Sequence, residues 1–266
     1  MGQLAGERIL SKFQFRSSGP VSTWCNSPWK RRWDVAGAVI LLILLFPFML
    51  VIATAVWCTS RGPVLFRQRR TGKDREEFYI LKFRTMISER RSHGPLLTNS
   101  IDPRVTPLGK VLRRWKLDEF PQLLNVLRGE MSFVGPRPHA TGLWNGSEVQ
   151  EAGDVVLSVR PGITSQTTLN FRHEEELLTP LPSDNVEEFY TKTIMPLKLT
   201  MEIKYLQQAS FTTDARTVLQ TVSRIFAKLE NAEPNPKVRD LVIEKSSRPG
   251  QIYEEPEYVP SADPAD

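Results

Sequence analysis

Two adjacent carboxylates, Asp118 and Glu119, are the residues of this 266-residue chain whose types and spacing best suit chemistry. The surrounding pattern predicts that a helix begins at this pair, because Asp is a favoured N-cap and Pro121 falls in the first turn, where a missing N–H costs little. Gly129 supplies a stop for this helix. By spacing alone, an ordinary capped helix is the more frequent explanation of such a pair.

Cationic residues surround the acid pair in the sequence and change that balance. The nearest are Arg113, Arg114, Arg128 and Arg137, while Lys82, Arg84 and Arg160 stand in other segments that apolar residues frame. Cations around carboxylates at a helix N-terminus suit a phosphate-bearing substrate together with a divalent metal. His139 is a lone histidine and is not included among the candidates.

An apolar run without charged residues, 35–60, lies upstream of these segments. It is long enough to span a bilayer core, since about 20 helical residues suffice. Pro47 lies near its middle, where proline removes one helical hydrogen bond and favours a kink. Lys and Arg, which collect on cytoplasmic flanks, are abundant on both sides of the run. Charge counting alone therefore leaves two topologies open, a spanning helix and a helix that bends and leaves on the side it entered.

The rest of the sequence predicts a mainly helical α+β fold. Two short apolar runs, 63–66 and 78–83, flank a Thr-Gly-Lys-Asp turn and predict a β-hairpin. Amphipathic helices are expected at 108–115, 186–209 and 215–229. The expected organisation is a polar leader (1–29), a membrane helix with its flanks (30–62), a catalytic domain (63–230) and a tail (231–266), which is rich in Pro, Glu, Asp and Ser and for which we expect no fold of its own.

Composition narrows the class of partners. The net charge is +5 and the pI is about 9.3, which fits anionic membranes, nucleic acid or phosphorylated ligands. Nucleic acid is the weakest of these, because the cations cluster around apolar segments and acids without a recognised motif. The chain has two cysteines, Cys25 and Cys58. They form no CxxC or Cys/His metal-binding spacing, and a disulfide framework is not expected either.

Several long motifs occur in a fixed order. They are Arg69–Gly72, Lys82–Met86, Asp102–Gly109, Leu112–Trp115, Leu117–Pro138 and Arg160–Thr164. On these motifs, and over about residues 30–227, the chain resembles the bacterial sugar transferase family, the monotopic phosphoglycosyl transferases. Two positions depart from the family pattern: Ser165 stands where Gly usually follows the Ile-Thr pair, and Lys116 stands where a small hydroxyl residue is frequent.

The resemblance implies an enzyme that moves a sugar-1-phosphate from a UDP-sugar to a polyprenol phosphate with Mg²⁺ as cofactor, releasing UMP in the first step of a surface-glycan or glycoconjugate pathway. It implies that Asp118 is a covalent nucleophile, that Asp118 and Glu119 hold Mg²⁺, and that Glu119 helps to move a proton. Phosphates would be bound by Lys82, Arg84, Arg114, Arg137 and Arg160. A re-entrant helix kinked at Pro47, interfacial amphipathic helices and a catalytic domain on the cytoplasmic face of the bacterial inner membrane are also implied. A homo-oligomer stays open.

Two alternatives remain at this point. One is direct transfer without a covalent intermediate, in which Asp118 and Glu119 act as metal ligands only. The other is a non-catalytic membrane adaptor that holds anionic lipid through its basic patches. An adaptor would not need adjacent acids within a basic region, so replacement of both acids separates the two classes.

Overall fold

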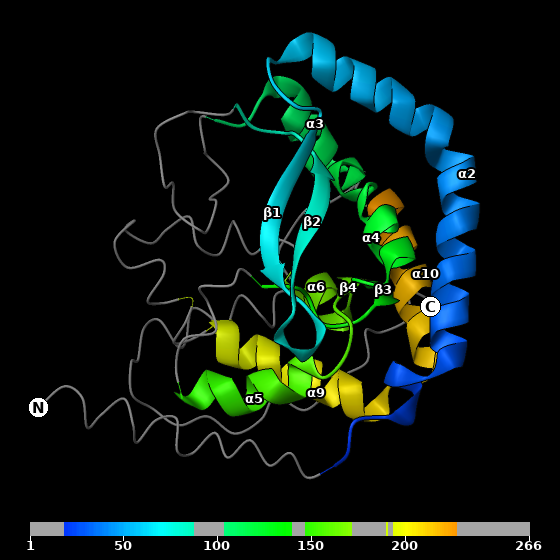
Figure 1. Cartoon of the computed structure of the whole chain (residues 1–266), viewed down its shortest axis with the longest axis vertical. Helices are drawn as coiled ribbons and strands as arrows, with labels where there is room; N and C mark the ends of the chain where they lie inside the picture. The colour runs from blue at the N-terminus through cyan, green and yellow to red at the C-terminus, as the bar shows by residue number, and fades with distance from the viewer. Residues whose placement is uncertain (1–18, 88–103, 140–146, 172–189, 191–193, 228–266) are drawn as a thin grey trace, which may run out of the picture.

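The computed structural model describes residues 19–87, 104–139, 147–171, 190 and 194–227. The fold is mainly helical and contains two small sheets (Figure 1). The polar leader up to residue 18 and the expected tail, 231–266, lie outside the described residues. The helical elements are η1 (Thr23–Asn26), α2 (Pro28–Thr59), η2 (Lys73–Arg75), α3 (Pro107–Arg114), η3 (Leu117–Glu119), α4 (Gln122–Arg128), α5 (Ser147–Leu157), α6 (Gln166–Asn170), α9 (Met195–Gln208) and α10 (Phe211–Ala227).

The predicted β-hairpin is present. β1 (Leu65–Thr71) pairs antiparallel with β2 (Glu77–Phe83), with Leu65 opposite Phe83. The second sheet is a short parallel pair, β3 (Ser132–Val134) and β4 (Gly162–Thr164). The two backbones approach closely beside this pair of strands. A Cβ atom on Gly162 would lie 2.2 Å from the backbone nitrogen of Gly135. Glycine is therefore required where the two strands run on into their turns.

Helix α2 is one continuous element of 32 residues that contains Pro47. Figure 1 shows it rising along one edge of the molecule and bending over the top of the view. By length and composition it could cross a membrane. Its inner face is buried at Ala38, Ile52 and Val56, whereas large apolar side chains cover the outer face. They include Val39, Ile40, Leu41, Ile43, Leu44, Phe46, Phe48, Leu50, Val51 and Trp57.

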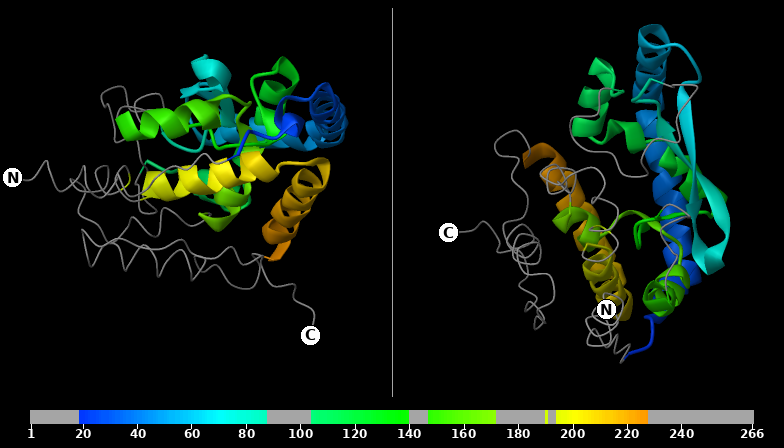
Figure 2. Two further views of the ribbon diagram at one scale, coloured as in Figure 1. Left: turned by 90° about the horizontal axis from the view of Figure 1, so that it is seen from below. Right: turned by 90° about the vertical axis from the view of Figure 1, so that its left-hand side faces the viewer.

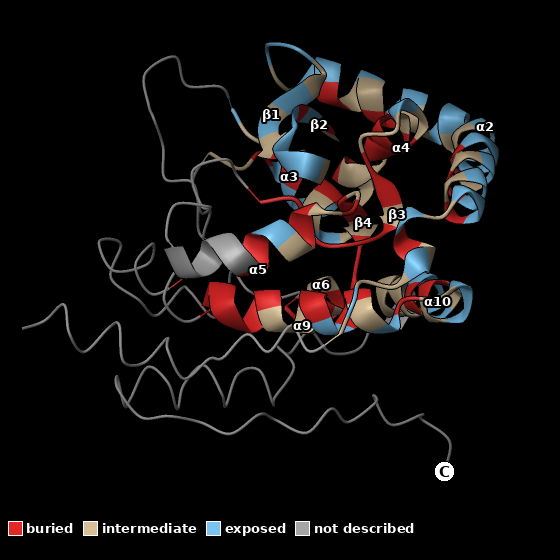
Figure 3. Cartoon of the chain, turned by 60° about the horizontal axis from the view of Figure 1, so that its bottom comes forward, coloured by how far each residue is buried: buried red, intermediate tan, exposed pale blue. Residues whose placement is uncertain are grey.

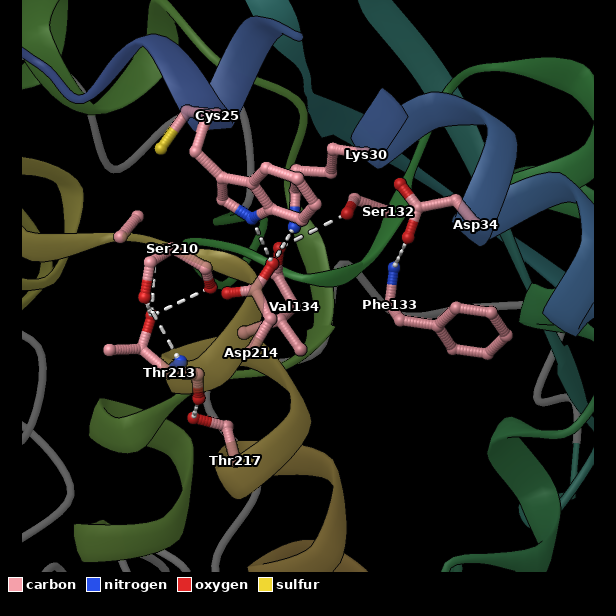
Figure 4. A network of polar contacts seen from close by, with 12 residues as sticks. Cys25, Lys30, Asp34, Ser132, Phe133, Val134, Ser210, Thr213, Asp214 and Thr217 are labelled. Carbon is pink, nitrogen blue, oxygen red and sulfur yellow. Dashed lines mark hydrogen bonds and ion pairs between the residues drawn. The ribbon is translucent and has the colours of Figure 1, made fainter. Parts of the chain in front are cut away.

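A buried polar cluster fixes the N-terminal end of α2 to the domain (Figure 4). Lys30 forms an ion pair with Asp214 of α10, and both side chains are buried. The second carboxylate oxygen of Asp214 accepts a hydrogen bond from the Tyr205 hydroxyl at 2.8 Å. On the next turn of α2, Asp34 Oδ1 accepts from the backbone N–H of Phe133 at 3.1 Å. The start of the apolar helix is therefore bound directly to β3 and α10, and through Asp214 to α9.

The largest core cluster gathers around α9 (Figure 3). α5 and α9 run side by side in Figure 2 and share this core, in which Met195, Leu199 and Leu206 are almost fully buried. Of the helix expected at 186–209, the structure describes α9, in which Pro196 lies in the first turn and lacks only an N–H that no helical carbonyl would accept. α9 is thus mostly a core helix, whereas α10 exposes Phe211, Val218, Leu219 and Val222.

Candidate active site

The acid pair lies in a 3₁₀ turn before α4, not at the N-cap of that helix. Asp118 and Glu119 belong to η3, and the N-cap of α4 is Pro121, which makes no side-chain capping bond. The predicted N-cap role of Asp118 is therefore wrong. The physical reason is that Pro121 has no N–H to donate to the Leu117 carbonyl four residues earlier; that carbonyl accepts from Phe120 instead, at 3.3 Å, which tightens the turn.

The end of α4 is as predicted. Gly129 adopts a left-handed conformation with φ of 86°, and its N–H closes the last turn. Two arginines also bind carbonyl oxygens at this end of the helix. Arg31 donates to the Val126 oxygen at 2.6 Å, and Arg160 Nε donates to the Gly129 oxygen at 2.8 Å. The element that follows the acid pair is thereby held at its far end.

Two cations meet the second acid of the pair. Lys82 Nζ, on β2, lies 2.9 Å from Glu119 Oε1. A guanidinium nitrogen of Arg137, in the turn after β3, lies 3.9 Å from the same oxygen. The structure thus brings together three of the predicted site residues from three separate elements.

Asp118 is the more buried acid, with 6% of its surface exposed. Its Oδ1 is buried and has no hydrogen-bond partner among the described residues. Burial raises the pKa of Asp118, the Lys82 ammonium opposes this, and the charge of Glu119 adds to it. Burial also works against the charged form of Glu119, but Lys82, Lys116 and Arg137 outweigh it and hold the pKa of Glu119 well below its usual range. The pKa of Asp118 is therefore raised while that of Glu119 is lowered, so Asp118 keeps its proton to a higher pH than Glu119 does.

Lys116 and Arg113 complete the charged surroundings of the pair. Arg113 was counted among the nearby cations in the sequence, but neither residue was predicted to have a role in the site. Lys116 is half-buried, adopts a left-handed backbone with φ of 56°, and reverses the chain between α3 and η3. Arg113 Nε donates to the Thr85 hydroxyl at 2.9 Å. Both cations favour the ionised form of Asp118. Their position two and five residues before Asp118 is a usable signal, but only a tight reversal at Lys116 turns that spacing into proximity.

Three of the predicted phosphate-binding cations have other surroundings. The Arg84 guanidinium donates to the Ser60 oxygen at 2.7 Å and to the Pro63 oxygen, so it binds the chain that leaves α2. Arg160 binds the Gly129 carbonyl as described, and Arg114 is exposed on α3. A role for these residues in phosphate binding stays a prediction.

The oxygen donors of the pair suit Mg²⁺, which takes one or two protein carboxylates and completes its shell with substrate phosphates and water. The unpartnered Oδ1 of Asp118 is an oxygen that such an ion or a phosphate could use. No group of three or more His, Cys, Asp or Glu side chains within the described parts of the chain could enclose a metal by itself. The arrangement therefore fits a metal that arrives with, or is shared by, a phosphate-bearing substrate.

The site is thus a largely buried acid pair that cations contact, and it lies beside the long apolar helix α2. Residues 25–228 match the family model described as bacterial sugar transferase, and the chain belongs to this family.

Named relatives carry related activities. The chain is 35% identical over 215 residues to an undecaprenyl-phosphate glucose phosphotransferase of Komagataeibacter xylinus, a match that covers 79% of this chain and 38% of that protein. It is 37% identical over 216 residues to a UDP-glucose:undecaprenyl-phosphate glucose-1-phosphate transferase of Caulobacter vibrioides, covering 79% of this chain and 74% of the relative. An exopolysaccharide production protein of Rhizobium leguminosarum is 44% identical over 142 residues, which are 51% of this chain and 70% of that protein.

Proposed function

We propose that this protein transfers a sugar-1-phosphate from a UDP-sugar to a polyprenol phosphate, giving a polyprenol-diphosphate sugar and UMP. The observation that carries the proposal is the pairing of a buried, unpartnered Asp118 oxygen with a neighbouring Glu119 that Lys82 and Arg137 contact. The names of the relatives support the donor and acceptor classes. One relative's name also places exopolysaccharide production among the pathways that such a step could begin.

In the proposed mechanism Asp118 is the nucleophile. Its carboxylate attacks the sugar-bearing phosphorus of the donor, an acyl–phosphate bond forms, and the bond to the bridging oxygen breaks so that UMP leaves with the electron pair. A phosphate oxygen of the polyprenol phosphate then attacks the same phosphorus and releases the Asp118 carboxylate. Lys82 and Arg137 supply positive charge where these phosphates gather. Mg²⁺, held by Asp118 and Glu119, would supply further neutralisation of phosphate charge when bound.

The contacts at both ends of α2 support a helix that enters and leaves the membrane on one side. Before the helix, the Ser22 N–H donates to the Leu206 carbonyl of α9 at 2.8 Å. After it, Ser60 is bound by Arg84, which directly follows β2. Both ends of α2 thus contact one catalytic part, while its apolar outer face is exposed. Basic residues on both flanks agree with a cytoplasmic location of that part.

This topology would place the acid pair at the membrane surface. The acceptor is a lipid whose phosphate head lies at that surface, and the donor is soluble. A shallow helix packed on the catalytic domain would let both reach Asp118. We therefore propose the cytoplasmic face of the bacterial inner membrane as the site of action.

The experiment that tests the function uses the purified full chain in detergent or nanodiscs. Wild-type protein, Mg²⁺ and a panel of UDP-sugars are combined with polyprenol phosphate, and UMP is measured. A covalent mechanism predicts ping-pong kinetics, some UMP release before acceptor is added, and labelling of the protein by a donor with radioactive β-phosphate. Asp118→Asn should abolish the labelling, and Glu119→Gln should slow turnover.

A matched control is Asp154→Asn, which removes an exposed acid on α5 and should leave labelling intact. Intersecting initial-rate lines, with no label trapped in wild-type protein, would instead favour direct transfer with the acids as metal ligands. The adaptor would be favoured by two results together. Wild-type protein would release no UMP with any donor, and a variant with both acids replaced would bind anionic vesicles as well as the wild type does.

A further inference from the structure

A second acid, far from the pair in sequence, lies beneath the turn that carries Arg137. Glu202 is in the middle of α9, is 1% exposed and belongs to the most deeply buried part of the domain. An ionisable carboxyl in such a place is costly unless it has hydrogen-bond partners. Its partners therefore indicate what it does.

One oxygen of Glu202 has two donors. The Ser165 hydroxyl donates to Oε1 at 3.0 Å, and the backbone N–H of Arg137 donates to the same atom at 3.4 Å. The other oxygen, Oε2, is buried without a hydrogen-bond partner among the described residues. Burial raises the pKa of Glu202 to about 7, although the bonds from Ser165 and from the Arg137 amide oppose the rise.

The Arg137 amide has a special place in its turn. Arg137 stands between Pro136 and Pro138, so it supplies the one backbone N–H of this tripeptide. The carbonyls on either side are also bound: the Pro136 oxygen accepts from Gly162 at 2.8 Å, and the Pro138 oxygen accepts from the Arg70 guanidinium at 3.2 Å. The backbone around Arg137 is thus held from three directions, and Glu202 supplies the contact to its only N–H.

The side chain of Arg137 connects this turn to the acid pair. Its guanidinium lies 3.9 Å from Glu119 Oε1, the oxygen that Lys82 contacts at 2.9 Å. A change in the backbone at Arg137 would move that guanidinium relative to Glu119. The path from Glu202 to the site is therefore short: one hydrogen bond to a main-chain atom, then one side chain.

We propose that Glu202 is a positioning residue of the transfer site, which fixes the Arg137 amide so that the guanidinium stays beside Glu119 and the substrate phosphates. This inference rests on the proposed function. It differs from a purely structural role, because it requires that the effect of Glu202 on catalysis pass through Arg137.

The test is a double-mutant cycle in the full chain. Glu202→Leu keeps roughly the volume of the side chain and removes both acceptor oxygens. We expect kcat to fall about 10-fold, because catalysis depends on the accurate placement of substrate-binding groups such as the Arg137 guanidinium. Glu202→Gln keeps one carbonyl oxygen and should stay within about 3-fold of wild type. In an Arg137→Ala background, Glu202→Leu should change kcat by less than about 2-fold, since the residue through which it acts is gone.

Thr167→Val is the matched control. It removes a buried hydroxyl that faces Glu202 and favours its ionised form, but it leaves in place Oε1, the acceptor of the Arg137 amide, so kcat should not change. If Glu202→Leu fails to fold, as judged by circular dichroism, Glu202→Asp replaces it. This variant draws the carboxylate back by one methylene, and its loss of kcat should likewise disappear without the Arg137 side chain.

An equal fractional loss of kcat in both backgrounds would overturn the inference and leave Glu202 as a stabilising residue. So would unchanged kcat in Glu202→Leu. A readout independent of activity is the amide resonance of Arg137 in protein labelled with ¹⁵N-arginine, which should shift upfield in Glu202→Leu and hold its position in Thr167→Val. An unshifted resonance would also overturn the inference, whereas absent UMP release by wild-type protein would reject the proposed function instead.

Discussion

The Lys82 ammonium lies 2.9 Å from Glu119 Oε1 and so joins the β-hairpin to the 3₁₀ turn that carries the acid pair. Both side chains are largely buried, with 19% and 11% of their surfaces exposed. At this burial the pair has lost much of its hydration, and each charge depends on the other. Lys82 also favours the ionised form of Asp118, so one cation acts on both acids.

Replacement of Lys82 by Met should reduce kcat/KM and change its pH profile. The ammonium lowers the pKa of both acids, so its removal raises both values. A mechanism that needs ionised Asp118 then loses activity at a higher pH than wild type, and the acidic limb of the profile moves upward. We expect a fall in kcat/KM of about 100-fold near neutrality. Lys204→Met, which removes an exposed lysine on α9, should leave the profile unchanged; an unshifted limb in Lys82→Met would contradict the prediction.

Pro47→Ala should favour a spanning topology. Alanine restores the helical hydrogen bond that proline omits, which straightens α2 and opposes a bend within the membrane. Cysteines placed at Pro20 and Lys204, both exposed, report which side each end occupies when intact cells are treated with an impermeant thiol reagent in a Cys58→Ser background. In the parent neither position should label, and in Pro47→Ala the Pro20 position should. Labelling at Pro20 but not Lys204 in the parent would show a spanning helix.

Asp214→Asn should destabilise the protein by about 3 kcal/mol, because it leaves Lys30 buried without its counter-charge. The amide oxygen can still accept from the Tyr205 hydroxyl, so the loss reports the ion pair together with the hydrogen bond that Trp24 Nε1 donates to the same carboxylate oxygen as Lys30. Thermal unfolding in one detergent measures it. Adding Lys30→Met should recover part of the stability.

The surface pair Arg69–Glu77 offers the comparison, since both side chains are about half exposed or more and lie 3.4 Å apart. Glu77→Gln should change the unfolding free energy by less than about 1 kcal/mol. An Asp214→Asn variant as stable as Glu77→Gln would show that the buried pair contributes little.

Glu202 should make stability fall as the pH rises from about 4.5 to about 7. In the unfolded chain this carboxyl loses its proton near the ordinary value of 4.5, whereas in the folded protein its pKa is about 7. Between these limits the folded state holds a proton that the unfolded state has released, so stabilisation present below the lower value is lost on approach to the higher one. At about 1.4 kcal/mol per pH unit, the loss reaches roughly 3 kcal/mol.

Glu202→Gln cannot titrate and isolates this contribution. The free energy of unfolding of the variant minus that of the wild type should be larger at pH 7.5 than at pH 5. Thermal unfolding of both proteins at both pH values measures this difference. Other acids contribute equally to both proteins and cancel in the difference. A difference that is independent of pH would mean that Glu202 titrates near its ordinary value.

Local features of the sequence determined much of this molecule. The long apolar helix with its proline, the hairpin and the end of α4 at Gly129 were predictable, because each depends on the conformational preferences of a few consecutive residues. The adjacency of Asp118 and Glu119 is likewise a property of the chain itself. Even here, the hydrogen-bonding limits of Pro121 moved the pair from a helix cap into a 3₁₀ turn.

Only the tertiary structure decided which charges meet. Lys82 reaches Glu119 across 37 positions, and Lys30 reaches Asp214 across 184. Arg84 has the same charge and nearly the same place in sequence as Lys82, yet it binds main-chain oxygens instead. Residue type and spacing do not encode such partners, because an unpaired carbonyl and a carboxylate both attract a guanidinium. Packing of α2, α3 and β2 around the turn and helix that carry the acid pair determines which acceptor each cation can reach.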